Sequence, residues 1–392
     1  MSRLRLLIAM LLFHSLLLAQ EQGNQTRKGF NITGIPVLKF NSDEGFGYGA
    51  RASIFHHADG GYNPYFFLID TQVSFTTESQ KEVFVFFDSP FLLGDGNRLT
   101  GEVRYQDNDF TPYYGLGHRS TFIEAIADTE DPSFINEDFY RFGRKRITAW
   151  LDYQRSMGTV RALAGFGINH TDVDLLAGTT LLEQDDAVSG RAGGFTNYIK
   201  LGLVYDTRDF EPAPNRGSWI DAVFAWSHEA IASGYNYRRL TLNQRQYISL
   251  SKKLVLAQRL AFINSWGDIP FYETAFIAST FRIEEGIGGS KSVRGVLKNR
   301  FLGPVETFGN LELRWRLTDF SLIGQNFFLS LNAFYDVGGA WNTIEAISLN
   351  SIQAGQGGGI NIGWDESFII SIDAGRGEDT DFALYIGVGY LF

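Results

Sequence analysis

The sequence is poor in the residues that many enzymes and nucleic-acid-binding proteins need. It has no cysteine, which excludes a disulfide framework, a thiol nucleophile and any metal site built on cysteine. Its 34 Lys and Arg are outnumbered by 44 Asp and Glu, whereas nucleic-acid binding leaves a basic footprint. Its six histidines are scattered without the spacing of metal ligands. We therefore expect no nucleic acid, no metal and no cofactor.

Long apolar runs are also missing beyond the N-terminus, although a membrane-spanning helix needs about 18 or more consecutive apolar residues. Aromatic residues make up 15% of the chain, which also contains 43 Gly. This composition suits strands and turns with aromatic girdles at the membrane interfaces. A β-barrel hides its apolar surface by alternating apolar and polar residues, so a membrane protein built from strands fits the composition.

Residues 1–19 predict a secretory signal peptide. Arg3 and Arg5 form a positive start, residues 6–18 are mostly apolar, and Ala19 is small enough for a cleavage site. The competing interpretation is a single helical anchor. We predict three parts: the signal peptide 1–19, a short periplasmic segment 20–31 and one barrel domain 32–392.

Residues 382–392 alternate clearly between two faces. This pattern predicts a strand with one apolar face, and its length suits a membrane-spanning strand of about 9–11 residues. Ending on an aromatic residue within such a strand is typical of bacterial outer-membrane barrels, whose last strand closes the cylinder. We interpret Tyr390 and Phe392 as this C-terminal strand signal. The apolar face comprises Phe382, Leu384, Ile386, Val388, Tyr390 and Phe392.

Similar alternating runs recur along the chain, and they predict an all-β fold. An even number of strands is expected of a single-chain bacterial barrel. We predict a transmembrane antiparallel β-barrel of about sixteen strands, closed between the first and the last. The predicted strands are 32–41, 45–57, 65–77, 81–90, 98–106, 144–154, 160–171, 197–207, 217–228, 235–249, 253–265, 308–318, 327–338, 357–364, 367–375 and 382–392.

The two faces of these strands differ in polarity. In 308–318, Leu311 and Leu313 alternate with Glu312 and Arg314. The apolar face should meet lipid, because a charge at the bilayer midplane costs about 2–4 kcal/mol. The four longest connections, 107–143, 172–196, 266–307 and 339–356, all follow odd-numbered strands, as expected of long external loops opposite short periplasmic turns.

The longest connection contains a short glycine-rich motif, and further short motifs follow or precede it in a fixed order. Together they resemble the BamA/TamA superfamily of outer-membrane barrels, of the surface-antigen type. The resemblance covers 197–392 well. The motifs are Pro270 to Glu273, Gly288-Gly289-Ser290, Val293-Arg294-Gly295, Leu302 to Pro304, Leu311-Glu312, Phe334 to Gly338, and Asp206 to Asp209 with Pro214 and Gly217.

The resemblance implies that the loop 266–307 folds back into the lumen and that Arg294 meets acidic groups there. Alternation directs Glu312 and Asp336 into the lumen on adjacent strands, so they are the expected partners. The alternative is that Arg294 is an ordinary solvated loop arginine. The chain departs from the family at Val296, where an aromatic residue is usual, and this departure predicts looser docking of the loop.

The closing strands look weakly bonded to each other. Pro36 has no N–H for a ladder hydrogen bond, and Gly34, Gly387 and Gly389 weaken the strands that contain them. A weak seam would suit the lateral opening attributed to the family. The alternative is that the glycines relieve curvature and that Pro36 merely precedes the paired region.

By resemblance, we expect a non-enzymatic protein of the Gram-negative outer membrane that assists insertion or translocation of proteins, or of lipids. Its expected partners are outer-membrane lipids, unfolded outer-membrane protein clients and periplasmic accessory proteins, around a monomeric barrel. The segment 20–31 is too short for the periplasmic POTRA modules of well-known members, which predicts a barrel-only member. The alternative function is a channel or structural barrel without assembly activity. A phospholipase-type Ser/His pair is a further, weaker hypothesis.

Overall fold

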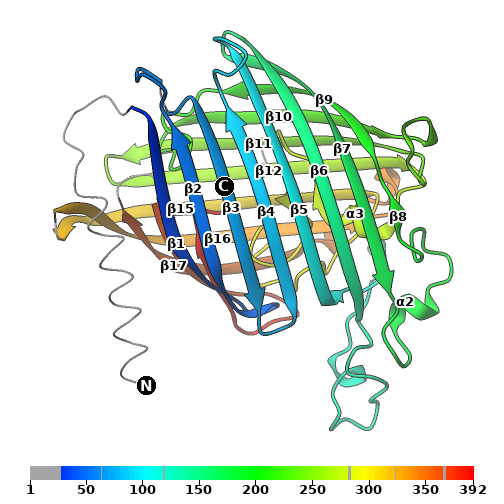
Figure 1. Ribbon diagram of the computed structural model, residues 1–392. Helices are drawn as coiled ribbons and strands as arrows, with labels where there is room; N and C mark the ends of the chain where they lie inside the picture. The colour runs from blue at the N-terminus through cyan, green and yellow to red at the C-terminus, as the bar shows by residue number, and fades with distance from the viewer. Residues whose placement is uncertain (1–27, 63, 118–119, 281–283, 323, 365–367) are drawn as a thin grey trace, which may run out of the picture.

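The computed structural model describes residues 28–392 except 63, 118–119, 281–283, 323 and 365–367; the predicted signal peptide and residues 20–27 lie outside this part. Sixteen long antiparallel strands close into a barrel, as predicted (Figure 1). They are β1 Phe30–Asn41, β2 Gly45–His56, β3 Phe67–Thr76, β4 Gln80–Ser89, β5 Asn97–Pro112, β6 Arg141–Met157, β7 Val160–Asp174, β9 Tyr198–Asp206, β10 Gly217–Ser227, β11 Tyr237–Ser251, β12 Leu254–Gly267, β15 Val305–Leu322, β16 Gln325–Trp341, β17 Gln353–Trp364, β18 Phe368–Arg376 and β19 Ala383–Val388.

Shorter elements lie in the connections. The two-residue strand β8 Gly194–Phe195 joins the barrel sheet beside β7, and β13 Phe276–Ile277 pairs with β14 Glu284–Glu285. The α-helices are α2 Leu181–Gln184 and α3 Phe271–Thr274, and the 3-10 turns are η2 Glu124–Ile126, η3 Glu229–Ile231, η4 Ile344–Ala346 and η5 Leu349–Ser351. None of the helices in the described residues is long and apolar enough to cross a membrane.

The wall of the barrel is apolar outside and polar inside, as alternation predicts. In β15, Leu311 and Trp315 expose 46% and 52% of their surface, whereas Glu312 and Arg314, from the other face, are almost fully buried. Strand β6 repeats the pattern, with Ile147 exposed beside buried neighbours. Exposed apolar rows alternating with buried charges suit a lipid-facing surface and contradict a soluble sheet.

The connections differ at the two ends of the barrel. Counted along the sixteen barrel strands, the four longest, 113–140, 175–197, 268–304 and 342–352, follow the fifth, seventh, eleventh and thirteenth strands, whereas turns such as 158–159 and 252–253 follow the sixth and tenth. The segment 113–140 and the region of α2 extend beyond the ends of the strands in Figure 1. This asymmetry matches the predicted placement of long external loops and short turns.

The barrel closes between its first and last strands, but the two strands pair over only a short length. β1 pairs with β2 along its whole length, and Pro36 lies in the middle of that pairing, opposite Ala50. In contrast, β1 pairs with β19 only at Phe40 and Asn41. Pro36 therefore lies within the ladder to β2 but before the residues that pair across the seam.

The last predicted strand is too long. β19 ends at Val388 rather than at Phe392. Gly389 has φ +88°, a left-handed conformation that favours glycine, and its N–H donates to the carbonyl of Ile369 at 2.8 Å. The chain turns away from the strand direction here, so the two aromatic residues that follow do not continue the lipid-facing row.

Candidate functional site: a buried loop beside the barrel seam

The connection 268–304 packs against the inner face of the wall. Ile287, Val293 and Val296 from this loop form one buried cluster with wall residues such as Phe308 of β15. The remaining members are Ala261 and Ile263 of β12, Ile277, Phe301 and Ala340 of β16. Val296 is only 1% exposed and belongs to this apolar cluster. The looser docking predicted from its replacement of an aromatic residue stays a prediction.

The glycines of the motif allow close approaches between backbones. Gly288 and Gly289 both have positive φ and are buried. Gly295 has φ +87°, and a Cβ at this position would lie 2.6 Å from the carbonyl carbon of Arg376 on β18. Only glycine fits such a contact without moving the backbone. The motif is therefore shaped to the wall that it touches.

Ser290 is half-buried, and a serine two residues later makes the internal bonds of the loop. The hydroxyl of Ser292 accepts from the Gly288 N–H at 2.9 Å and donates to the carbonyl of Gly286 at 2.7 Å. The side-chain amide of Asn310 on β15 donates to the Ser292 carbonyl. Sequence reasoning missed Ser292, although its place between Gly288 and Arg294 marks it as part of the same turn.

Arg294 lies at the centre of an acidic site on the inner wall. Its Nε donates to Asp336 Oδ2 at 2.8 Å, and its Nη1 donates to Glu312 Oε2 at 2.8 Å. A third carboxylate, Asp373 of β18, accepts from Nη1 at 3.0 Å. The guanidinium carbon also lies 3.6 Å from the ring centre of Phe334. The structure thus brings together the three residues named from the sequence and adds Asp373, which was missed, and Phe334, which belongs to a named motif but had no predicted role here.

This arrangement keeps the guanidinium charged. Arg294 is 1% exposed, and burial alone would lower its pKa, but Asp336 and Glu312 raise the pKa of Arg294 well above its ordinary value. Its backbone N–H also donates to Asp336 at 3.1 Å. A planar fork of donors suits several carboxylates at once. Without the arginine, three carboxylates would face one another in a buried space.

The start of the loop is attached to another part of the wall. Glu273 of α3 accepts from Arg146 of β6 at 2.6 Å and from the hydroxyl of Thr196 at 2.7 Å. Burial would raise the pKa of Glu273, but Arg146, with help from Arg239, holds it below its ordinary value. Arg239 of β11 also donates to the Glu273 carbonyl at 2.7 Å. Charged contacts therefore fix both halves of the loop.

The second half of the loop also touches both flanks of the seam. On the β19 side, the N–H of Gly295 donates to the hydroxyl of Tyr385 at 3.0 Å. On the β1 side, Lys298 forms an ion pair with Glu44, and its backbone N–H donates to Asp43 at 3.1 Å. Asp43 and Glu44 lie in the connection between β1 and β2. The loop therefore bridges the first and last strands from inside.

A further contact holds the same end of the barrel. Arg300 of the loop pairs at 2.6 Å with Asp379, in the connection between β18 and β19. Across the seam, the N–H of Leu384 donates to the hydroxyl of Ser42 at 2.8 Å. All of these contacts lie near the two paired positions of β1 and β19.

The other predicted seam residues are not paired across the seam, although Gly387 directly follows the paired Ile386. Gly34 is opposite Ala52 of β2, and Gly387 is opposite Ser371 of β18. A Cβ at Gly34, Gly387 or Gly389 would meet nothing within 4 Å. These glycines therefore border open space rather than a tightly packed seam.

Tyr390 and Phe392 turn toward the inner wall. The guanidinium carbon of Arg314 lies 4.0 Å from the ring centre of Tyr390, and Arg314 donates to the main-chain oxygen of Phe392 at 2.9 Å. The ring of Phe392 lies 6.3 Å from that of Tyr247 on β11. The two predicted signal residues thus contact inner-wall residues of β15 and β11 rather than lipid.

Comparison with known proteins agrees with this architecture. The Omp85 superfamily domain matches residues 68–385, and the chain belongs to this superfamily. Among solved structures, BamA from Haemophilus ducreyi lacking POTRA domains 1-3 is 16% identical with a TM-score of 0.58, covering 93% of this chain and 71% of that one. CdiB from Escherichia coli is 13% identical with a TM-score of 0.59, covering 92% and 63% respectively. No curated protein sequence matches.

A third similar structure is CdiB from Acinetobacter baumannii, 13% identical with a TM-score of 0.53, covering 93% of this chain and 60% of that one. The chain thus spans less than two thirds of either CdiB. It is an Omp85-type barrel whose fold is similar to those of BamA and CdiB, and this fold implies a bacterial outer membrane. In the part of the chain that the structure describes, no three His, Asp or Glu residues are grouped to hold a metal.

Proposed function

We propose that this barrel assists the insertion or translocation of proteins, or of lipids, at the outer membrane, without catalysis. One observation carries the proposal: the first and last strands share only two paired positions, while a buried loop bridges both flanks of that seam. The unpaired N–H and C=O groups of strand edges are templates for another strand. Opening the seam would offer such edges to a client within the membrane.

In this proposal the Arg294 cluster positions the loop, and the loop sets how far the seam opens. The residues Gly288, Gly289, Val293 and Gly295 shape the loop to the wall. Glu312 and Asp336 hold Arg294 by charge. The glycines beside the seam and Pro36 keep the rest of it weakly bonded. Unfolded outer-membrane proteins and periplasmic accessory proteins are the partners that we propose, with a monomeric barrel as the working unit.

A reversible disulfide across the seam tests the proposal. Because the chain has no native cysteine, only the two introduced cysteines can form it. Phe40 and Ile386 are partners across the seam, so the double variant F40C/I386C should form a disulfide there. Liposomes containing the oxidised variant should insert a test barrel more slowly than the same liposomes after reduction. The matched control L313C/A333C joins partners on β15 and β16 and should be insensitive to reduction. Equal insertion by the locked and reduced seam would contradict the proposal.

A channel is the second candidate, favoured by one observation. The loop 268–304 packs its apolar cluster and Arg294 against the inner wall, as a plug would. If the barrel is a plugged channel without assembly activity, R294A should raise single-channel conductance in planar bilayers. The insertion assay above should then show no difference between liposomes with and without the protein.

A further inference from the structure

A cavity of about 320 Å³ lies at the end of the barrel that carries the short connections. Three separate parts of the chain enclose it. They are the connection 207–216 with Ala213, the turn between β11 and β12 with Lys252 and Lys253, and the segment after β19 with Tyr390. Inner-wall residues of β15 and β16, among them Arg314, complete it.

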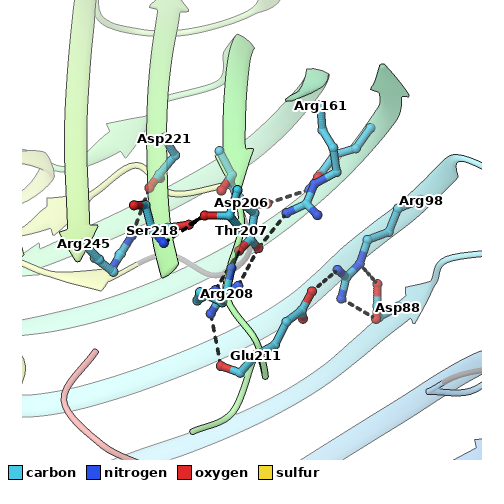
Figure 2. Close-up of polar contacts among 12 residues, drawn as sticks. Asp88, Arg98, Arg161, Asp206, Thr207, Arg208, Glu211, Ser218, Asp221 and Arg245 are labelled. Carbon is cyan, nitrogen blue, oxygen red and sulfur yellow. Dashed lines mark hydrogen bonds and ion pairs between the residues drawn. The ribbon is translucent and has the colours of Figure 1, made fainter. Parts of the chain in front are cut away.

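The connection 207–216 is firmly held, so this side of the cavity is built rather than transient. Arg208 pairs with Asp206 at 2.7 Å and donates to the Glu211 carbonyl at 3.0 Å. Glu211 reaches Arg98 of β5, which itself pairs with Asp88 of β4 (Figure 2). These contacts attach the connection to β4 and β5.

The same connection reaches the opposite wall through apolar contacts. Buried Ala213 packs with Phe328 of β16 and Ile369 of β18, and Tyr390 packs against this group. The connection therefore crosses the end of the barrel between two walls. On the strands that follow this connection, Arg245 of β11 pairs with Asp221 of β10 at 2.9 Å (Figure 2). This ion pair joins β10 to β11.

The lining of the cavity has one sign of charge. It includes Lys252, Lys253, Arg314 and Arg316, and no Asp or Glu. Arg316 pairs with Asp319 at 2.6 Å. Within the described residues, neither lysine has an ion-pair partner, although Lys253 Nζ donates to the Leu317 carbonyl at 3.2 Å. The two lysines therefore bring positive charge to the cavity lining, and no carboxylate among the described residues pairs with them.

Arg314 supplies the buried side of the cavity. It is 4% exposed; its Nε donates to Glu312 at 2.7 Å and its Nη2 donates to the main-chain oxygen of Phe392 at 2.9 Å. Its Nη1 is buried and has no hydrogen-bond partner among the residues that the structure describes. Arg314 therefore adds a buried positive charge to this wall of the cavity.

We propose that this cavity binds a phosphate group, as a monoester or diester. Arginine and lysine are both common phosphate ligands, lysine as a point charge. A planar carboxylate is best held by the paired donors of one guanidinium fork, and two donors of Arg314 are already engaged. A tetrahedral anion instead offers acceptors to both lysines at once, within the positive field of Arg314 and Arg316. Walls of low dielectric strengthen this attraction.

The phosphate has two chemical sources, a phospholipid head group or free phosphate. Tyr390, which follows β19 in the chain, borders the cavity at the end of the barrel with the short connections. This inference goes beyond the proposed function and does not require that the barrel insert proteins.

Binding to the folded, detergent-solubilised full chain tests the inference. Inorganic phosphate is titrated by calorimetry, and phosphatidylglycerol or uncharged diacylglycerol is offered in mixed micelles and detected by native mass spectrometry. Binding of inorganic phosphate identifies free phosphate as sufficient, and binding of phosphatidylglycerol alone identifies the lipid head group. The double variant K252A/K253A should weaken either binding by about tenfold or more. Both lysines are exposed on a turn, so heat-modifiable migration should show that the variant still folds.

The matched control is R216A, which removes one exposed cation from the same end of the barrel but outside the cavity lining. Its binding should stay within about twofold of the unaltered chain. Failure of both phosphate and phosphatidylglycerol to bind would overturn the inference. Binding by K252A/K253A that equals binding by the unaltered chain would also overturn it. The same holds if diacylglycerol is retained as well as phosphatidylglycerol, or if an equal concentration of acetate displaces phosphate.

Discussion

The hairpin β15–β16 and the seam β1–β19 are both antiparallel strand pairs, yet they differ greatly in how they are held. β15 and β16 are opposite each other at seventeen positions, whereas β1 and β19 are opposite at two. The hairpin is stabilised mainly by its own ladder. The seam depends on side chains, because Lys298, Gly295 and Arg300 of the loop contact its flanks from inside.

The comparison shows where this barrel can open at least cost. Each missing ladder bond removes a contribution of about 0.5–1.5 kcal/mol, so separating β1 from β19 costs far less than separating β15 from β16. The contacts of the loop gather at one end of the seam, near Phe40 and Asn41. Beyond Phe40 and Ile386, toward Gly34, no ladder pairs the two strands.

Replacing Arg294 should have the largest effect. R294A leaves Asp336, Glu312 and Asp373 facing one another, and removing one partner of a buried ion pair costs about 3–5 kcal/mol. The urea midpoint of the heat-modifiable folded form should fall accordingly. R191A, which breaks the exposed pair with Asp186, is the control and should cost less than about 1 kcal/mol. Equal midpoints for R294A and R191A would show that the buried pairing is not needed.

A methyl group at Gly295 should have the next largest effect. G295A combines an unfavourable positive φ with a collision at the Arg376 backbone, and we expect about 2–3 kcal/mol of destabilisation. Because Gly295 also donates to Tyr385, the seam should open more readily. Protease cleavage within 268–304 should then accelerate. G387A, at an open position, should leave cleavage unchanged, and faster cleavage in G387A would argue against a specific role for Gly295.

Restoring the usual aromatic residue at position 296 should harm the protein. Val296 is buried among Ile287, Phe301 and Phe308, and overpacking a full cluster typically costs about 1–3 kcal/mol. V296F should therefore lower the urea midpoint, while V296I should change it by less. A higher midpoint for V296F would mean that the cluster has room and that the loop is loosely docked.

Lowering the pH should have a smaller effect than any of these substitutions. It should weaken the contact between the loop and the β1–β2 connection. Burial would raise the pKa of Glu44, but Lys298 and Lys39 lower it to about 2, below the ordinary value of about 4.3. A carboxyl with a lowered folded-state pKa stabilises fully above its unfolded value and loses this contribution as the pH falls toward 2. The stability of E44Q should therefore depend less on pH between about 4.5 and 2 than that of the unaltered chain. Parallel pH profiles would contradict this ion pair.

The wall of the barrel could be predicted because alternation is a local signal. Leu311, Glu312 and Leu313 already show which side faces lipid, and the same pattern along the chain yields sixteen strands. The pairing of Arg294 with Glu312 and Asp336 came from the family resemblance, with alternation supplying the direction of the two carboxylates. Asp373 carried a signal that was missed, since it lies between the apolar Ile372 and Ala374 in an alternating run.

The bridge across the seam could not be predicted in the same way. Lys298 and Glu44 are 254 residues apart in the sequence, and no local pattern relates them. The prediction of where β19 ends was wrong for a different reason. Alternation continues to Phe392, but a single left-handed residue, Gly389, redirects the chain and overrides the pattern. The backbone conformation of one turn residue therefore ends the strand, although the alternation in the sequence continues beyond it.

Hydrogen exchange of the folded barrel in detergent tests the central claim most directly. If the seam is the weak line of the wall, the amides of β1 that face β19 and those at the end of β19 should exchange faster than the amides of β15 and β16. The difference should grow in K298A, which removes the ion pair with Glu44. Uniform protection around the barrel, unchanged in K298A, would contradict the account.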